Sequence, residues 1–305
     1  MTRVAVVGAG AIGGVLAALA AARGHDVTVG VRTPFAALRV STGGVEHEVP
    51  ATVATDPGAV GVHPWVLLAT KAQDTASAAG WLGALTGPGT VLVVAQNGVD
   101  HAARVEGLVD PGTTVLPASV VLGAEAVAPG RVVHHGFGRL TVPAGDAAEG
   151  LAALYGSDTD GHADGAGLAV VATGDFTTVA WRKLLSNAVA NPVTALTGRR
   201  NDVLAEPATR DLVVDLAREV MAVGRSVGAA LTDADVDALV AHYDGMPPGL
   251  GTSMLYDRLA GRPLEHEYLT GAVVATGRRT GVPTPLNTAV LALLRGVRGG
   301  NGQVT

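Results

Sequence analysis

Length, composition and charge exclude several classes of protein. The chain has 305 residues, of which 48% are hydrophobic and 16% charged, so we expect a folded protein with two domains. Its net charge is −6 and its basic residues are scattered, which disfavours nucleic acid as a partner. Apolar runs are short and the first residues do not resemble a signal peptide, so we expect a cytoplasmic protein without membrane spans. Without cysteine, disulfides and thiol nucleophiles are excluded.

The amino-terminal segment predicts a β-turn-α-β unit. Residues 3–7 form a β-branched run typical of a buried parallel strand. A glycine-rich turn at residues 8–13 leads into an alanine- and leucine-rich helix at residues 14–23, and residues 27–31 predict a second strand. In this setting the turn matches the G-x-G-x-x-G pattern of dinucleotide-binding proteins. Its members are Gly8, Ala9, Gly10, Ala11, Ile12 and Gly13.

Each glycine of this turn has an expected role. Gly8 would make the tight turn, Gly10 would let a pyrophosphate approach the backbone, and Gly13 would allow close packing of the helix on the strand. The alternative is a glycine turn that binds no ligand.

Alternating strands and helices over residues 1–174 predict an α/β fold, a Rossmann domain with a doubly wound parallel sheet. An all-α carboxyl-terminal domain at residues 175–298 and a disordered tail at 299–305 complete the expected organisation. A glycine- and aspartate-rich loop is expected at residues 156–167. The remaining expected elements are strands at 65–69, 91–95, 115–122 and 168–172; a hairpin of 131–135 with 139–143 around Gly136-Phe137-Gly138; and helices at 75–85, 101–108, 147–155, 176–190, 207–227, 233–243, 267–279 and 285–298.

The end of the second strand bears on the choice of cofactor. NAD-dependent enzymes usually place an acidic residue there for the ribose hydroxyls, whereas this chain has Arg32 and no acid. A guanidinium can bind the 2′-phosphate of NADP. Arg32 therefore favours NADPH, with a solvated surface arginine as the alternative.

Two further strand ends carry polar residues that could face a ligand. Lys71 follows the strand at residues 65–69, and Asn97 follows the strand at residues 91–95. Ligands of doubly wound sheets lie at the carboxyl ends of the strands, so both side chains are candidates for contacts with cofactor and substrate. Asn97-Gly98 fits an ordinary turn equally well.

A row of polar residues marks the first helix of the second domain. Lys183, Asn187 and Asn191 are spaced four apart, which places them on one helix face among Ala, Val and Leu. We expect Pro192 to end or kink this helix. The row is either a solvated stripe or a ligand-binding face.

The lysine content favours the second interpretation. Only two of the 21 basic residues are lysines, Lys71 and Lys183. Arginine stays protonated, whereas a partly buried lysine can give up and regain a proton. Lys183 is therefore the candidate general acid. We expect no metal site, because His134 and His135 are adjacent on a strand and point to opposite faces.

Together these motifs resemble the ketopantoate (2-dehydropantoate) reductase family, in the family's order and over nearly the whole chain. The motifs are Gly8 to Gly13, Arg32, Thr70-Lys71, Asn97-Gly98, Trp181-Arg182-Lys183-Leu184, Asn187, Asn191-Pro192, Ser253-Met254, Asp257, Glu265 and Tyr268.

The resemblance implies roles for these residues. Lys183 would donate the proton to the ketone oxygen of a small 2-keto acid, and NADPH, held in the cleft between the domains, would supply the hydride. Glu265, Lys71 and Asn97 would lie near the nicotinamide end of the cofactor, Asn97 also contacting the substrate. The remaining substrate contacts would be Asn187, Asn191, Asn201 and Ser253. A homodimer is a further expectation.

Departures from the family pattern cluster near the implied substrate pocket, at Thr252, Tyr256, Glu267 and Thr270. They leave the identity of the substrate open. A relative of the β-hydroxyacid dehydrogenases or imine reductases is the alternative enzyme, although the glycine segment typical of that group is not evident. A non-catalytic NADPH sensor is the alternative of another class.

Overall fold

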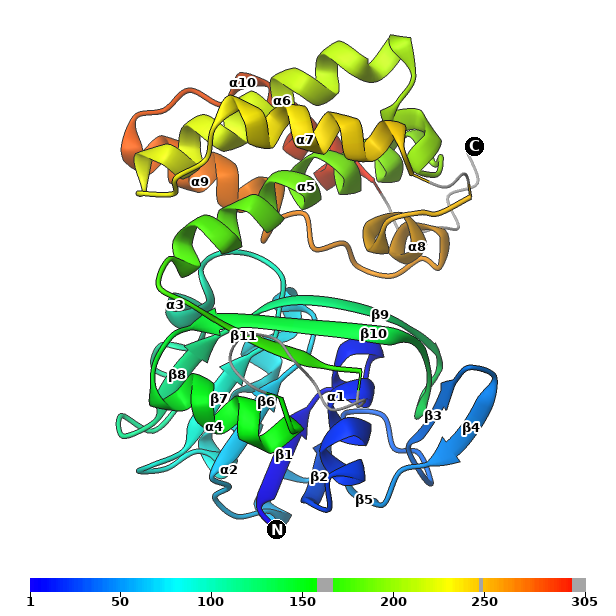
Figure 1. Ribbon diagram of the computed structural model, residues 1–305, viewed down its shortest axis with the longest axis vertical. Helices are drawn as coiled ribbons and strands as arrows, with labels where there is room; N and C mark the ends of the chain where they lie inside the picture. The colour runs from blue at the N-terminus through cyan, green and yellow to red at the C-terminus, as the bar shows by residue number, and fades with distance from the viewer. Residues whose placement is uncertain (158–166, 247–248, 298–305) are drawn as a thin grey trace. The chain divides into compact units, whose positions relative to one another are not determined.

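The structure is a computed structural model that describes residues 1–157, 167–246 and 249–297 (Figure 1). It divides into two compact units, Met1–Phe176 and Thr177–Thr305, which are described separately below. The expected tail at 299–305 and most of the expected loop at 156–167 lie outside the described residues. Within the described ranges, no helix is both long enough and apolar enough to cross a bilayer.

The first unit contains a six-stranded parallel sheet with the order β5-β2-β1-β6-β7-β8. If these six strands are counted along the chain, the order is 3-2-1-4-5-6, which is that of dinucleotide-binding Rossmann sheets. The strand order reverses between β1 and β6, where such sheets bind their ligands. The strands are β1 (Arg3–Val7), β2 (Asp26–Gly30), β5 (Ala51–Ala54), β6 (Trp65–Leu68), β7 (Val91–Val94) and β8 (Thr114–Pro117).

Both faces of this sheet are buried, which is why its strands read as continuous apolar runs. Val4 and Val6 belong to the core formed with α1 (Ala11–Ala22). Ala5 and Val7 point the other way, into the core beneath α2 (Ala79–Leu85). The prediction of a doubly wound parallel sheet is therefore confirmed. Shorter elements beside it are α3 (His101–Val105) and the 3-10 turns η1 (Pro57–Ala59), η2 (Ala72–Asp74) and η3 (Ala76–Ala78).

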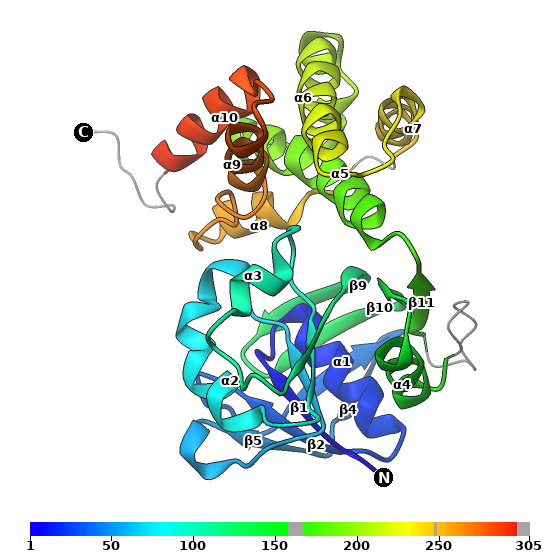
Figure 2. The same cartoon turned by 90° about the vertical axis from the view of Figure 1, so that its left-hand side faces the viewer.

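A second sheet, which the sequence did not predict, lies on the other side of α1. Its central strand β10 (Arg131–Pro143) pairs antiparallel with β9 (Ser119–Ala128) along one edge. Along its other edge it pairs with β3 (Arg39–Thr42) at its start and with β11 (Ala169–Thr173) at its end. β4 (Val45–Glu48) extends β3, and α4 (Asp146–Tyr155) packs on β11. Helix α1 contacts strands of both sheets, an arrangement that can be followed in Figure 2.

Several expectations for the first unit were wrong. The hairpin around Gly136-Phe137-Gly138 does not exist: residues 131–143 are one strand, and these residues carry a shift in its register with β9. The strand expected at 115–122 is two strands, β8 and β9. The helix expected at 75–85 begins with the 3-10 turn η3, and only residues 79–85 form the α-helix α2. The strands β3, β4 and β5 were missed because each has only four residues, most of them polar or small, and so shows no clear alternation of apolar and polar residues.

The second unit is helical throughout its described part. Helix α6 contacts α7, α9 and α10 and so lies at the centre of the helical packing. Thr232 begins α7 in a capping box with Asp235, as expected of an N-cap residue. The elements are α5 (Phe176–Thr197), η4 (Asn201–Leu204), α6 (Pro207–Ser226), α7 (Asp233–Asp244), α8 (Ser253–Leu259), α9 (Thr270–Thr280) and α10 (Pro285–Gly296).

Two expectations for the helices were also wrong, and one helix was missed. Helix α5 does not end at Pro192 but continues to Thr197, and Asn191 keeps helical geometry. Residues 188–195 are all buried, and this packing overrides the local bias of the residue before a proline. Helix α9 begins at Thr270, not at residue 267, and α8 was not predicted at all.

Candidate active site

The glycine turn, residues 8–13, joins β1 to α1 at the point where the strand order reverses. Gly8 has a φ of +97°, and a Cβ there would lie 2.9 Å from the Thr70 nitrogen. A Cβ on Gly13 would lie 1.9 Å from the Gly8 oxygen. Both positions therefore require glycine for the fold itself. A Cβ on Gly10, in contrast, would meet no atom within 4 Å.

Gly10 is also the N-cap residue of α1. The first hydrogen bond of the helix runs from the Gly14 amide to the Gly10 oxygen, at 2.8 Å. The amides of Ala11, Ile12 and Gly13 precede it and have no intrahelical acceptor. Free amides, the helix dipole and open space in front of Gly10 together form an arrangement suited to a phosphate group.

Arg32 lies two residues beyond the end of β2. Its side chain is 82% exposed, and its Nη1 lies 4.0 Å from Asp74 Oδ1. A guanidinium so accessible to solvent can turn towards a ligand at little cost. Among the described residues, Asp74 is its only acidic neighbour within ion-pair distance.

Lys71 and Asn97 follow β6 and β7, as predicted, and a buried glutamine lies between them. Gln96 is 3% exposed, and its Nε2 donates hydrogen bonds to Thr70 Oγ1 at 2.9 Å and to the Thr70 carbonyl at 3.1 Å. Its Oε1 accepts a hydrogen bond from Arg104 Nη1 at 3.0 Å, and the same Nη1 donates to the Asn97 carbonyl at 2.9 Å. Sequence reasoning assigned no role to Gln96; the signal was an amide immediately after an apolar strand.

In the second unit, Lys183, Asn187 and Asn191 lie on one continuous helix, α5, and are called the lysine row below. Lys183 and Asn187 are partly buried, and Asn191 is only 4% exposed. A row that ends in a buried asparagine is not a solvated stripe. The observed burial therefore removes that alternative for its carboxyl-terminal end.

The surroundings of Lys183 change its acidity. Burial lowers the pKa of Lys183 to about 8, and the Glu265 carboxylate partly offsets this by raising the same pKa. Glu265 is 4% exposed. Glu265 was expected near the cofactor, and in the structure its negative charge also acts on Lys183.

Other expected substrate residues lie elsewhere in the second unit. Asn201, in η4, is buried; its Nδ2 is 3.7 Å from Met246 Sδ, and its Oδ1 has no hydrogen-bond partner among the described residues. Ser253 is exposed at the first position of α8. In the described part of the chain, no hydrogen bond joins either residue to Asn187 or Asn191.

Helix α8 is nevertheless attached to α5. Thr252 Oγ1 accepts a hydrogen bond from the Leu255 amide at 3.2 Å and is hydrogen bonded to Thr194 Oγ1 at 2.7 Å. Arg258 Nη1 donates to the Leu196 carbonyl at the end of α5, at 3.0 Å. These contacts fix Ser253 relative to the carboxyl-terminal part of α5.

The other departures from the family pattern have mainly structural surroundings. Glu267 forms a two-point ion pair with Arg295 of α10, at 2.6 and 2.8 Å. Thr270 is fully buried at the start of α9. Tyr256 is 41% exposed, and its hydroxyl oxygen lies 3.4 Å from Arg200 Nη1.

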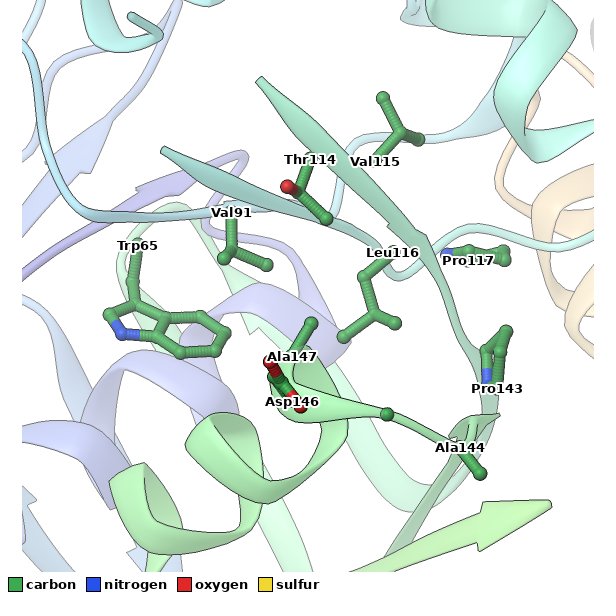
Figure 3. Close-up of a pocket in the computed structure, with 11 residues that line it drawn as sticks. Trp65, Val91, Thr114, Val115, Leu116, Pro117, Pro143, Ala144, Asp146 and Ala147 are labelled. Atoms are coloured by element: carbon green, nitrogen blue, oxygen red, sulfur yellow. The ribbon is translucent and has the colours of Figure 1, made fainter. Parts of the chain in front are cut away.

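A cavity of about 520 Å³ lies away from these residues (Figure 3). Trp65 and Val91, the first residues of β6 and β7, line it together with all of β8 and the turn before α4. Its lining contains none of the predicted site residues.

His134 and His135 behave as their positions on a strand predict. His134 is buried and His135 is exposed. In the described ranges, no group of three or more His, Asp or Glu side chains is arranged to hold a metal ion.

Comparison with known proteins covers both units. The model of the family "Ketopantoate reductase PanE/ApbA" matches residues 4–147, and that of "Ketopantoate reductase PanE/ApbA C terminal" matches residues 175–298. A 2-dehydropantoate 2-reductase of Caulobacter vibrioides is 40% identical over 297 residues, covering 96% of this chain and 98% of the relative. One of Mycobacterium tuberculosis is 38% identical over 307 residues, covering 99% of each chain.

A solved structure agrees with these relatives. The 2-dehydropantoate 2-reductase from Methylococcus capsulatus superimposes with a TM-score of 0.85 at 29% identity and covers 99% of each chain. The family models cover the glycine turn and the lysine row alike, which favours this family over the β-hydroxyacid dehydrogenase alternative. The chain therefore belongs to the ketopantoate reductase family.

Proposed function

We propose that this protein reduces ketopantoate (2-dehydropantoate) to pantoate with NADPH, a step of pantothenate and coenzyme A biosynthesis. The observation that carries the proposal is Lys183: a partly buried lysine with a pKa of about 8, coupled to the buried Glu265, on the same helix face as two asparagines. The names of the relatives that match nearly the whole chain support the choice of substrate.

Membership of the family implies a nicotinamide cofactor, and the residues at the carboxyl ends of β1, β2, β6 and β7 suit NADPH. The glycine turn would hold the pyrophosphate, because Gly10 leaves open space beside free amides. Arg32 would bind the 2′-phosphate. Lys71 and Asn97 would contact the nicotinamide end, and Glu265 the nicotinamide ribose. Bound there, NADPH supplies a hydride.

The residues of the second unit would handle the proton and the orientation of the substrate. The Lys183 ammonium would donate a hydrogen bond to the keto oxygen and transfer its proton as the carbonyl carbon gains the hydride. A pKa of about 8 keeps most of this lysine protonated at neutral pH, yet makes it a stronger acid than an ordinary lysine. Asn187, Asn191 and Asn201 would orient the substrate.

Ser253 would bind the carboxylate of the substrate. With Asn97 also in contact with the substrate, the proposal requires residues of both units. We accordingly assign cofactor binding mainly to residues 1–174 and substrate binding mainly to residues 175–298. The cytoplasmic location and the homodimer stay predictions; light scattering on the purified chain measures the assembly.

The experiment is a substrate profile. Oxidation of NADPH is followed with ketopantoate, other 2-keto acids and cyclic imines, and reduction of NADP⁺ is followed with β-hydroxy acids. We expect the highest kcat/KM with ketopantoate. A preference for an imine or a β-hydroxy acid would replace the proposed substrate. Tight NADPH binding without turnover of any compound would instead support the sensor alternative.

A further inference from the structure

We propose that Gln96 and Arg104 are positioning residues that hold the two strand ends expected to contact the nicotinamide. This inference rests on the proposed function, because it concerns the same cofactor site. It goes further by assigning a role to two buried side chains that no motif identified. Both lie in the first unit, at the carboxyl end of its parallel sheet.

The orientation of the Gln96 amide follows from its neighbours. Arg104 has only donors, so the group facing its Nη1 must be the oxygen, Oε1. The Nε2 group then faces acceptors in the segment that follows β6: the Thr70 carbonyl and hydroxyl oxygens, and Thr75 Oγ1 at 3.0 Å. The Thr75 hydroxyl donates its own hydrogen bond to the Ala72 carbonyl at 2.9 Å. One side chain thus joins the end of β6, the turn after it and β7.

Arg104 extends the network to the next residue along the chain. Its side chain is 4% exposed, and its guanidinium contacts the Gln96 oxygen, the Asn97 carbonyl and the Asp100 carboxylate. His101 Nε2 donates to the Gln96 carbonyl at 3.0 Å. The backbone of Asn97 is therefore held from both sides, and the backbone before Lys71 is held by Gln96.

Glutamine and arginine have the hydrogen-bonding groups that this positioning role requires. A glutamine presents a donor to β6 and an acceptor to Arg104 at once, which no apolar or singly charged side chain can do. A guanidinium donates to its three acceptors through a planar fork of fixed geometry, which an ammonium does not have. Removing either partner leaves buried polar groups unsatisfied at two strand ends together.

The hydrogen bonds of Gln96 and Arg104 belong to the carboxyl end of the parallel sheet. A comparable buried side chain, Thr90, serves the opposite end of β7: its Oγ1 donates to the His63 carbonyl at 2.8 Å and accepts from the Gly87 amide at 3.1 Å. Thr90 is 1% exposed. Thr90→Val is therefore a matched control that removes buried hydrogen bonds from the same strand but away from the site.

The test compares two ligands in the full-length protein. NADPH carries the nicotinamide, whereas adenosine 2′,5′-bisphosphate carries only the adenosine and its phosphates. Dissociation constants for both are measured by fluorescence or calorimetry with the wild type, Gln96→Met and Thr90→Val. We expect Gln96→Met to raise the dissociation constant of NADPH about five- to twentyfold and that of adenosine 2′,5′-bisphosphate less than about twofold. Thr90→Val should lower thermal stability and change neither constant.

The inference would be overturned if Gln96→Met weakened the binding of both ligands equally. It would also be overturned if Gln96→Met changed the two dissociation constants no more than Thr90→Val does. If Gln96→Met does not fold, Gln96→Glu keeps the acceptor for Arg104, loses the donor for Thr70, and should show the same difference between ligands. Turnover of ketopantoate is measured separately. A wild type that binds NADPH but does not reduce ketopantoate refutes the proposed substrate, while the two ligands still decide the role of Gln96.

Discussion

The binding roles proposed for the glycine turn and the lysine row rest on opposite kinds of structure. In the turn, the proposed ligand-binding groups are backbone amides, and the sequence contributes mainly by omitting side chains at Gly8, Gly10 and Gly13. In the row, the proposed binding groups are side chains, and the helix contributes by spacing Lys183, Asn187 and Asn191 evenly. The first arrangement fails when atoms are added, the second when they are removed. Mutations of the two should therefore have different signatures.

The largest effect is expected at Lys183. Lys183→Ala should lower kcat by about 10²–10⁴, the usual contribution of a positioned acid, while the NADPH dissociation constant barely changes. Lys183→Arg should also lose most activity, because arginine keeps the charge but does not release a proton at neutral pH. The control is Arg182→Ala, one residue away in a surface ion pair with Asp235, which should keep the wild-type kcat. Near-normal turnover by Lys183→Arg would show that the lysine only binds an anion.

The same residue predicts a pH dependence. Only the protonated lysine can donate, so kcat for reduction should fall as pH rises through the pKa of about 8. Since burial lowers this pKa from 10.5, the folded state disfavours the charged lysine, and stability should increase between about pH 8 and pH 10.5. Lys183→Met should accordingly unfold at a higher temperature at pH 7. A flat rate profile between pH 7 and pH 9 would assign the proton to another group.

On the cofactor side, Arg32→Asp should discriminate between cofactors. Losing one charged hydrogen-bonded contact costs roughly 1.5–3 kcal/mol, so NADPH affinity should fall about 10- to 150-fold while NADH affinity changes little. Arg39→Asp is the control, because it makes the same change of charge on a remote exposed pair with Glu48. Equal KM values for NADPH and NADH in the wild type would remove the role assigned to Arg32.

Gly10→Ala tests the glycine turn most directly. The added Cβ would meet no protein atom, and the φ of −74° suits alanine, so thermal stability should stay the same or rise. The methyl group would, however, occupy the space assigned to the pyrophosphate, and NADPH affinity should fall about tenfold or more. Gly13→Ala is the contrasting variant and should unfold, because its Cβ would collide with the Gly8 oxygen. A stable Gly10→Ala protein that binds NADPH normally would refute the phosphate site.

These contrasts also explain what the sequence could predict. The turn was readable because strand, glycines and helix are adjacent in the chain, and β1 was predicted to the residue. The second sheet was not, because its strands pair over long separations, as β10 does with β3, and because β3 and β4 have only four residues each. Gln96 was missed for a related reason: its partners Thr70 and Arg104 are close only after folding. Pro192 misled because local bias yields to the burial around it.

Within the lysine row, Asn191→Ala should separate substrate from cofactor. Loss of one hydrogen-bonding group should raise the KM for ketopantoate about tenfold, with the NADPH dissociation constant unchanged. Thr197→Val is the control on the same helix, because it removes a hydroxyl bonded to backbone groups near the end of α5, the Val193 and Thr194 carbonyls and the Arg199 amide. A loss of NADPH binding as large as the rise in KM would mean that the row binds the cofactor instead.

The smallest effect is expected at Asp74. Its substitution tests whether the proposed cofactor site keeps its affinity for NADPH when a side-chain group is removed. Asp74 Oδ1 lies 4.0 Å from Arg32 Nη1, so its carboxylate would compete with the 2′-phosphate that we propose Arg32 binds. The pair is exposed, which limits its contribution to less than about 1 kcal/mol and makes it sensitive to salt. Asp74→Asn should therefore tighten NADPH binding two- to fivefold at low salt, leave NADH binding alone, and lose its effect at high salt. Glu48→Gln removes the same charge from the remote Arg39 pair and should do neither. If Asp74→Asn weakens NADPH binding, the Asp74 carboxylate orients Arg32 towards the phosphate and does not compete with the phosphate. The proposed cofactor site, like the lysine row, would then lose affinity when a side-chain group is removed.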